Sequence, residues 1–360
     1  MVLVFQYFVS LILVIALSGS PSLIAQETSV KIGLLIPGRS SKEIIHAAEL
    51  AINQANLREG YRDQPFELVI RTTEGPWGAG SKQSVALVYE ESVRAILGSL
   101  DGRNAHLAEQ VAVKSHITYL ETRATESTLS QAYVPWFFRC VPSDDQQSIA
   151  ILELLRQKEQ GTIAILATEE NDSRQAARSF IRVAARKENS SQAPLIINPD
   201  ESDIQQLIHK VGKRNIRHLI VTVHSQVTLE IIERIRERMP EVMMYGTHSF
   251  TSGIDLQTPS WDTYEGMTLI SAEILRTPEG KQFQDFFQSK YGYKPGLSAF
   301  HAYDGTKLII QAIRHAGSDR EAIKVYISET RFTGWATGTI SFDELGNRTG
   351  ATLFTHIDSP

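Results

Sequence analysis

The sequence is poor in cysteine. Cys140 is the only cysteine in 360 residues, which excludes an internal disulfide and a cysteine-based zinc site. It stands in the strand-like run WFFRC, a context typical of a small buried hydrophobic residue. No cysteine follows the apolar N-terminal stretch, so a bacterial lipoprotein anchor at that site is excluded as well.

Catalytic signatures are also missing. The ten histidines form no H-E-x-x-H, and neither a G-x-S-x-G elbow nor a G-x-G-x-x-G fingerprint occurs. Gly75 and Gly80 are spaced as in a phosphate-binding loop, but Gln83 follows Lys82 where such a loop has a hydroxyl. No nucleophile–base pair or metal set can be assembled. We therefore expect a protein that is not an enzyme and holds neither a cofactor nor a metal.

The charge pattern excludes further classes. The net charge is −5 and no basic block is visible, so a nucleic-acid partner has little support. The length is enough for about two ordinary domains with full cores. We expect a monomer whose partner is a small molecule.

Residues 1–26 differ from the rest of the chain because they contain no charged residue. The almost continuously apolar run Val2–Leu17 is broken at Ser18–Pro21, which is the pattern of a secretory signal peptide. This pattern predicts export into a periplasm. An uncleaved membrane anchor is the alternative, although the apolar run is short for spanning a bilayer.

After residue 26, apolar strand-like runs alternate with helical patterns in two successive series. The runs are continuous rather than alternating, as expected for parallel strands with helices on both faces. The sequence therefore predicts an α/β fold of two doubly wound, Rossmann-like lobes. The expected boundaries are 27–141 for the first part of lobe one, 142–270 for lobe two, 271–331 for the second part of lobe one, and 332–360 for a C-terminal hairpin of lobe two.

Ligands of open α/β sheets bind at the carboxyl ends of the strands. Three arginines fall on the expected lobe-one loops and would suit a carboxylate or phosphate, unless Glu74, Asp101 and Glu121 merely neutralise them. His224 and His248 follow lobe-two strands, and we expect them to be hydrogen-bonded cleft residues. Metal ligands are the alternative, although no carboxylate at ligand spacing accompanies either histidine. The loop candidates are Arg39, Trp77, Asp101, Arg103, Glu121, Arg123, Asp172, His224 and His248.

Several motifs resemble a known family. VKIGLLIPG with AELAINQAN, WFFRCVPSDDQQ, the run YGYKPGLSAFHAYDGTKLIIQAIRHAGS and TGTISFDELGNR occur in the order found in type I periplasmic solute-binding proteins of ABC importers. The similarity is to the branched-chain amino acid and amide group, the Leu/Ile/Val-binding-protein-like family. It covers almost all of residues 30–350.

The resemblance implies a type I periplasmic binding protein fold, with a ligand cleft between two lobes that close by a hinge and deliver the ligand to a permease. Family ligand positions fall on Gly102 and on Ala124 and Thr125. The sequence departs from the family at Glu121, and at Asp172, where the lobe-two motif lacks its aromatic residue. A solute more polar or anionic than a branched-chain amino acid is the resulting expectation. A sensing module that reports to a membrane or signalling partner is the alternative.

Overall fold

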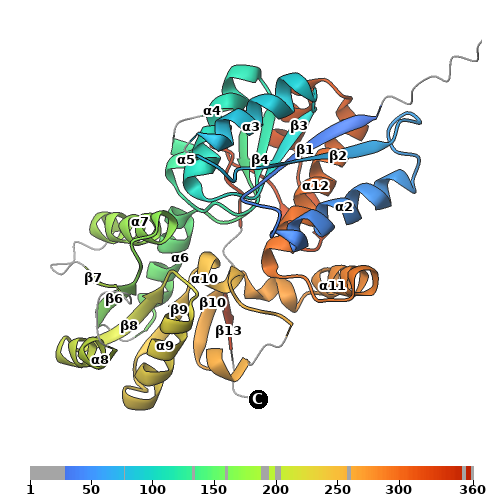
Figure 1. Ribbon diagram of the computed structural model, residues 1–360. Helices are drawn as coiled ribbons and strands as arrows, with labels where there is room; N and C mark the ends of the chain where they lie inside the picture. Colours follow the sequence, from blue (N-terminus) through green and yellow to red (C-terminus); the bar gives the residue numbers. More distant parts are fainter. Residues whose placement is uncertain are drawn as a thin grey trace, which may run out of the picture.

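The computed structural model describes residues 29–76, 78–131, 134–158, 161–187, 194–198, 204–257, 261–350 and 354–357. The expected signal segment 1–26 lies outside the described residues. The described chain forms two α/β lobes, one above the other in Figure 1. This arrangement confirms the predicted fold class.

Lobe one contains a five-stranded parallel sheet in the order β2-β1-β3-β4-β5. Its strands are β1 (Val30–Ile36), β2 (Phe66–Thr72), β3 (Ala95–Gly98), β4 (Thr118–Glu121) and β5 (Phe137–Arg139). The inner strands β3 and β4 are buried along their whole length, because helices cover both faces of the sheet. The edge strand β2 is only partly buried.

The helices of lobe one come from both ends of the chain. From the first part come α2 (Lys42–Asn56), α3 (Ala79–Val85) with its π-helical continuation η1 (Ala86–Glu90), α4 (Gly102–Ser115) and α5 (Thr128–Gln131). From the second part come α11 (Pro278–Tyr291), α12 (Leu297–Ala316) and α13 (Arg320–Glu329). The apolar sides of α2 and α12 share one core with the sheet, and α4 packs in a second core on its other face.

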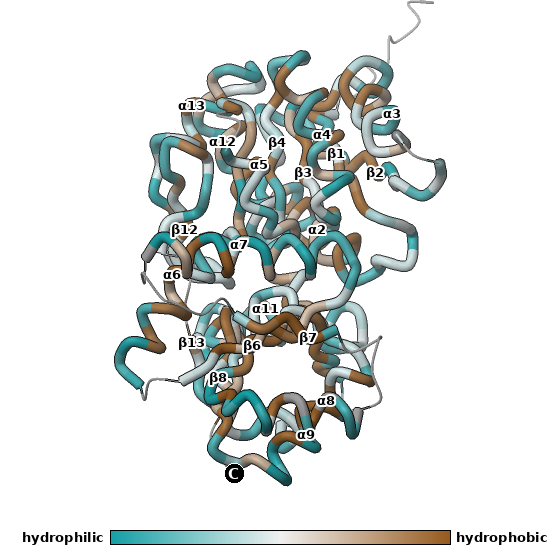
Figure 2. The backbone as a smooth tube through the Cα atoms, turned by 90° about the vertical axis from the view of Figure 1, so that its left-hand side faces the viewer, coloured by the Kyte–Doolittle hydropathy of each residue, from teal (hydrophilic) through white to brown (hydrophobic). Residues whose placement is uncertain are grey.

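Lobe two contains a six-stranded sheet in the order β13-β10-β9-β8-β6-β7, parallel except for β13. Its strands are β6 (Thr162–Leu166), β7 (Leu195–Ile197), β8 (Ile216–Val221), β9 (Met243–Gly246), β10 (Met267–Ile270) and β13 (Phe354–His356). Its helices are α6 (Asp144–Leu155), α7 (Asn171–Lys187), α8 (Ile204–Lys213), α9 (Gln226–Arg238), α10 (His248–Ser252), and the 3-10 turns η2 (Trp261–Tyr264) and η3 (Ala272–Leu275). Figure 2 shows α7 at the junction of the lobes, next to lobe one.

The predicted C-terminal hairpin is wrong in its pairing. The turn is present, because Phe342 and Arg348 form an antiparallel bridge. However, β12 (Gly338–Ile340) pairs with β11 (Phe332–Trp335), and both contribute to the lobe-one core. The strand β13 instead pairs antiparallel with β10 in lobe two.

Candidate functional site

The two lobes meet at the carboxyl ends of their parallel strands. The loops after β3 and β4 come from lobe one, and the loops after β6, β8 and β9 come from lobe two. This is the edge at which open α/β sheets bind ligands. Of the candidate residues, Trp77 lies outside the described residues.

Glu121, the last residue of β4, is held in a cradle of backbone amides. The N–H groups of Thr122, Arg123 and Ala124 donate to its Oε1 at 3.0, 2.8 and 3.1 Å. A fourth donor comes from the neighbouring loop, where Leu100 N–H lies 3.1 Å from the same oxygen. Burial raises the pKa of the Glu121 carboxyl, against the opposing effect of its hydrogen bonds. The side chain is 0% exposed, so its carboxyl group is enclosed by the loop and does not face solvent.

The surroundings of Glu121 are shaped to admit its carboxyl group. The Tyr119 hydroxyl donates to Glu121 Oε2 from the same face of the strand. Gly98 is the register partner of Glu121 on β3. A Cβ on Gly98 would collide with the Tyr119 ring and lie 2.6 Å from Glu121 Oε2. A glycine is therefore required opposite the buried carboxyl group.

A second carboxylate crosses the junction between the lobes. Asp172, in the first turn of α7, accepts a hydrogen bond of 3.0 Å from the backbone N–H of Gly102, the first residue of α4. Asp101 caps α4 by accepting from Asn104 N–H at 3.0 Å. Burial raises the pKa of Asp172, and nearby Asp101 adds to this effect, whereas the Gly102 amide and Arg123 oppose it. The structure thus brings three of the candidate residues together: Asp101, Gly102 and Asp172.

Glu126 joins this group from lobe one. Its Oε2 lies 3.2 Å from Asn171 Nδ2 of lobe two, and its Oε1 lies 3.5 Å from His106 Nε2. Burial alone would raise the pKa of Glu126, but hydrogen bonds from His106 and Thr128 outweigh it and lower the pKa. Hydrogen bonds to Glu109 and Glu126 raise the pKa of His106 to about 9. Glu126 is therefore an ionised carboxylate at the junction, and sequence reasoning did not single it out.

Asp144, at the start of α6, is a further carboxyl group at this junction. Its backbone N–H donates to Thr125 O at 2.8 Å, which ties the first crossing segment to the loop after β4. The residue is 4% exposed, and its Oδ2 has no hydrogen-bond partner among the described residues. Burial raises the pKa of Asp144 to about 7, against the opposing effects of Thr125 and Arg139.

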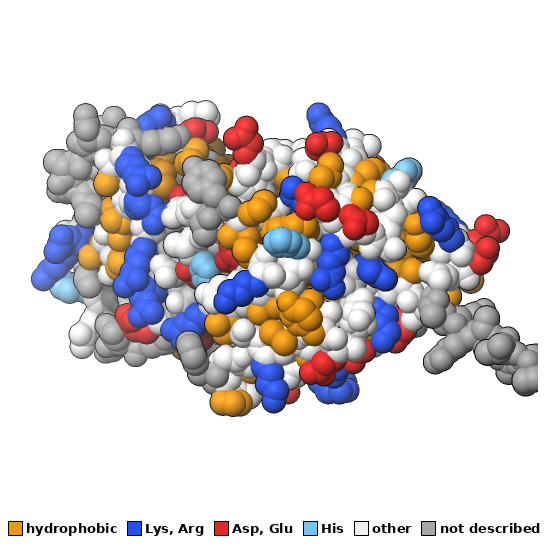
Figure 3. All heavy atoms as spheres, turned by 90° about the horizontal axis from the view of Figure 1, so that it is seen from above, with side chains coloured by type: hydrophobic (Ala, Val, Ile, Leu, Met, Phe, Trp, Pro, Cys, Tyr) orange, Lys and Arg blue, Asp and Glu red, His pale blue; other side chains and the backbone are white. Residues whose placement is uncertain are grey.

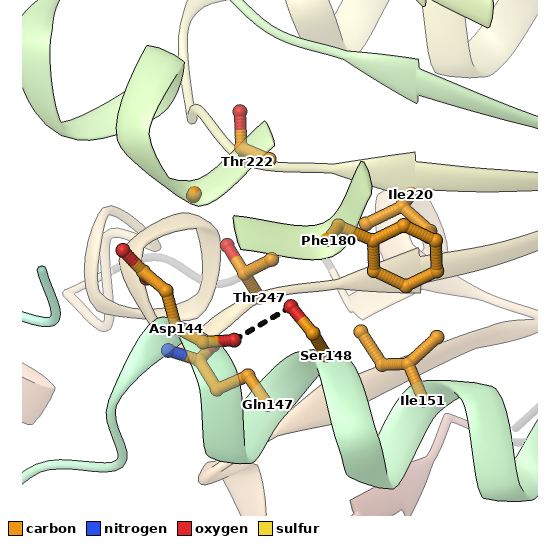
Figure 4. A pocket seen from close by; sticks show the side chains of 9 residues that line it. Asp144, Gln147, Ser148, Ile151, Phe180, Ile220, Thr222 and Thr247 are labelled. Carbon is orange, nitrogen blue, oxygen red and sulfur yellow. Dashed lines mark hydrogen bonds between the residues drawn. The ribbon is translucent and has the colours of Figure 1, made fainter. Parts of the chain in front are cut away.

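A small cavity lies beside Asp144, and all the residues that line it belong to lobe two (Figure 4). Its polar part is lined by Gln147, Ser148, Thr222 and Thr247, and its apolar part by Phe180 and other side chains of the core. The free space is about 10 Å³, close to the minimum for one water molecule. The cavity is too small for a solute of amino-acid size.

The two candidate histidines are engaged within lobe two. His224 Nε2 lies 2.9 Å from the Tyr264 hydroxyl. His248 is 2% exposed, and its Nδ1 and Nε2 lie 2.9 and 3.2 Å from the hydroxyls of Ser271 and Ser252. Burial lowers the pKa of both histidines, that of His248 to about 3. Both are therefore hydrogen-bonded neutral rings, as in the non-metal alternative.

The three candidate arginines are exposed. The guanidinium groups of Arg39, Arg103 and Arg123 form no hydrogen bond or ion pair within the described ranges. Arg123 lies close enough to Glu43 and Asp172 to oppose the rise in their pKa values. Pairwise neutralisation by Glu74, Asp101 and Glu121 is therefore not what the structure shows, because Glu121 and Asp101 bind backbone amides instead.

Two buried arginines at the lobe junction escaped sequence reasoning. Arg139 donates to Glu126 O at 2.6 Å and to Ser130 Oγ at 2.7 Å. Arg348, 4% exposed, donates to Cys140 O at 3.1 Å and Thr339 O at 2.7 Å. They join the segment that leaves lobe one after β5 to the turn before β13. An arginine inside the apolar run WFFRC was the available signal, since a buried charge requires partners.

The chain matches the model of a family described as the receptor family ligand binding region, over residues 44–353. The chain belongs to this family. Among solved structures, it is similar to the branched-chain amino acid transporter substrate-binding protein LivJ of Streptococcus pneumoniae in complex with isoleucine. That likeness has 19% identity and a TM-score of 0.72, and covers 92% of this chain and 97% of that one.

Another similar structure is a solute-binding protein of an ABC transporter from R. palustris in complex with benzoate. It has 14% identity and a TM-score of 0.72, with 92% and 97% of the two chains covered. These likenesses confirm the type I periplasmic binding protein fold. A curated relative is glutamate receptor 3.7 of Arabidopsis thaliana, 21% identical over 283 residues, which are 77% of this chain and 30% of the receptor. The chain thus spans about a third of the length of its curated relatives.

Two further observations limit the chemistry. Among the described residues, no three His, Cys, Asp or Glu side chains are grouped so that they could bind a metal ion. In the same part of the chain, no helix has the length and apolar character needed to cross a membrane.

Proposed function

We propose that this protein is the substrate-binding component of an ABC importer. It binds a small polar solute, an amino acid, amide or organic acid, between its lobes by hinge closure and delivers it to a permease. It acts as a monomer without catalytic activity, in the periplasm, after export directed by residues 1–26.

The observation that carries this proposal is the hydrogen bond between Gly102 N–H and Asp172 across the junction. It joins two sheet edges at which ligands bind, and Asp172, its partner in lobe two, is partly exposed. Arg139 donates to Asn347 Oδ1 and Arg348 donates to Cys140 O, which joins the segment after β5 to the turn before β13. In this proposal Arg39, Arg103 and Arg123 line the outer part of the cleft, and Ala124 and Thr125 its floor.

The face of lobe one seen in Figure 3 mixes acidic and basic side chains with apolar ones. A mixed surface of this kind offers no continuous positive field for a nucleic acid.

A thermal-shift screen over amino acids, amides and organic acids tests the proposal. At a hundredfold excess over Kd, a ligand stabilises the folded state by about 2.7 kcal/mol, which gives a clear rise in Tm. A folded protein that no small solute stabilises would contradict it. Cell fractionation with N-terminal sequencing tests export and cleavage near residue 26.

A sensing module is the second candidate function. It is favoured by the curated relatives, which are receptors of which this chain spans about a third. Purified protein, with and without ligand, can be tested for binding to the membrane proteins encoded beside it. Ligand-dependent binding to a permease supports transport, and ligand-dependent binding to a kinase or other signalling protein supports sensing.

A further inference from the structure

The amide cradle around Glu121 is an anion-binding site that the chain fills itself. Four backbone N–H groups from the loops after β3 and β4 converge on one oxygen atom, at 2.8–3.1 Å. Successive N–H groups arranged in this way form a concave site for an anion. Its occupant is the carboxylate of Glu121, which is 0% exposed and held from its other side by Tyr119.

The next amide along this edge is also taken. Gly102 N–H donates to Asp172, which reaches over from lobe two. A solute carboxylate entering the cleft would find these five amides already bonded to carboxylates of the protein. It would also lie beside Glu126, which the structure keeps ionised. Like charges at such short range disfavour each other strongly when they are partly desolvated.

The side chains nearest to Gly102 are acceptors, whereas the arginines Arg39, Arg103 and Arg123 are exposed. Asp172 and Glu126 approach each other around Gly102: a Cβ there would collide with Glu126 Oε2 and lie 3.1 Å from Asp172 Oδ1. Behind them lies Asp144, 4% exposed, with an oxygen that has no partner among the described residues. Asp144 also lines the small cavity of lobe two, which has room for about one water molecule. Because these residues include no group of three metal ligands, an organic donor fits better than a metal ion.

We propose that Glu121 and Asp172 are built-in anions that determine the ligand class: the cleft selects a small amine or amide that lacks a free carboxylate. Its N–H groups bind Asp172 and Glu126 once the lobes open to admit it. This inference rests on the proposed function, since it specifies the solute for the same cleft. It replaces the expectation of an anionic solute, which was based on the loop arginines.

The test uses matched probes on one carbon skeleton: an amino acid, its amide, and the amine left when its carboxylate is removed. Such triplets, built on glycine, alanine, serine, leucine and phenylalanine, are titrated into the full chain by calorimetry and thermal shift. We expect the amide or the amine of at least one triplet to bind at least tenfold more tightly than the free acid.

Two variants sharpen the test. Glu121→Ser empties the cradle, and should improve the affinity for the free acid at least tenfold relative to wild type. Glu91→Gln removes one negative charge at an ion pair with Lys31 and Arg71, and should leave the order within a triplet unchanged. If Glu121→Ser does not fold, the order measured on the wild-type protein still decides.

Each outcome has a distinct meaning. A free acid that binds as tightly as its amide and amine overturns this inference but supports solute capture. If no triplet member binds while a solute with a free carboxylate in the wider screen does, the inference is also overturned and capture stands; an amide from that screen that binds supports both. If no solute of any kind stabilises the folded protein, the proposed function itself fails.

Discussion

Asp144→Asn should stabilise the protein above neutral pH. Burial raises the pKa of this carboxyl group from 3.8 to about 7. Between these values the folded chain holds a proton that the unfolded chain has released, so its stability falls as the pH rises from about 4 to about 7. Each pH unit is worth about 1.4 kcal/mol, so ionised Asp144 costs about 4 kcal/mol at pH 8. Asparagine keeps the shape and an acceptor oxygen but has no charge to bury.

The assay is chemical unfolding of wild type and Asp144→Asn from pH 5 to pH 8. We expect the advantage of the variant to grow by about 3 kcal/mol over this range. Asp145→Asn is a matched control on the neighbouring residue. Burial alone would raise the pKa of Asp145, but hydrogen bonds from Ser179 and Arg182 outweigh it and lower the pKa. The Asp145→Asn variant should therefore lose stability at pH 8. An Asp144→Asn effect that is independent of pH, or that turns unfavourable at pH 8, would refute the reasoning.

Three further predictions concern the junction of the lobes. Gly102→Ala places a methyl group against the carboxylates of Glu126 and Asp172 at the junction of the lobes. X-ray scattering without ligand should therefore show a larger radius of gyration for this variant than for wild type. Gly212→Ala should leave the radius of gyration unchanged, because its Cβ would meet only a methionine sulfur at 3.8 Å. Arg348→Met leaves buried carbonyl groups without donors and should cost at least about 3 kcal/mol in chemical unfolding, whereas the exposed Arg234→Met should cost less than about 0.5 kcal/mol. His301 is buried, and neither of its ring nitrogens has a partner among the residues that the structure describes. Burial strongly lowers its pKa, so acidification from pH 6.5 to pH 5 charges it only in the unfolded chain. His301→Met should therefore lose about 2 kcal/mol less stability than wild type over that step in chemical unfolding, and an equal loss would contradict the reasoning.

The fold was accessible from the sequence because it depends on continuous apolar runs. Runs such as Val30–Ile36 and Ala95–Gly98 can be buried on both faces only in a parallel sheet covered by helices. The C-terminal pairing was not accessible, because two short strands flanking a turn look the same whether they pair with each other or elsewhere. Here β10 had an unpaired edge that took β13, and only the three-dimensional arrangement reveals such an edge.

The sequence indicated which loops follow the strands, but it did not give the contacts that their side chains make. A glutamate at the end of a strand is normally predicted to be a loop residue that faces solvent. The neighbouring sequence does not predict that the carboxyl group of Glu121 turns inward to the backbone amides of Thr122–Ala124. The available signal was weak: Tyr119 stands two residues earlier on the same face, and a glycine ends the neighbouring apolar run at Gly98. The polar roles of Arg139 and Asp144 depend on partners from distant segments, which periodicity does not reveal.

The pairing of β13 with β10 has a consequence for how the molecule can be divided. Between these two strands the chain returns to lobe one and builds α11, α12 and α13 there. Any single cut in that interval leaves two fragments that each contain part of both lobes. Neither lobe can therefore be produced by expressing one continuous stretch of sequence. Two such fragments produced together should instead reassemble, because each supplies strands or helices that complete the sheets of the other.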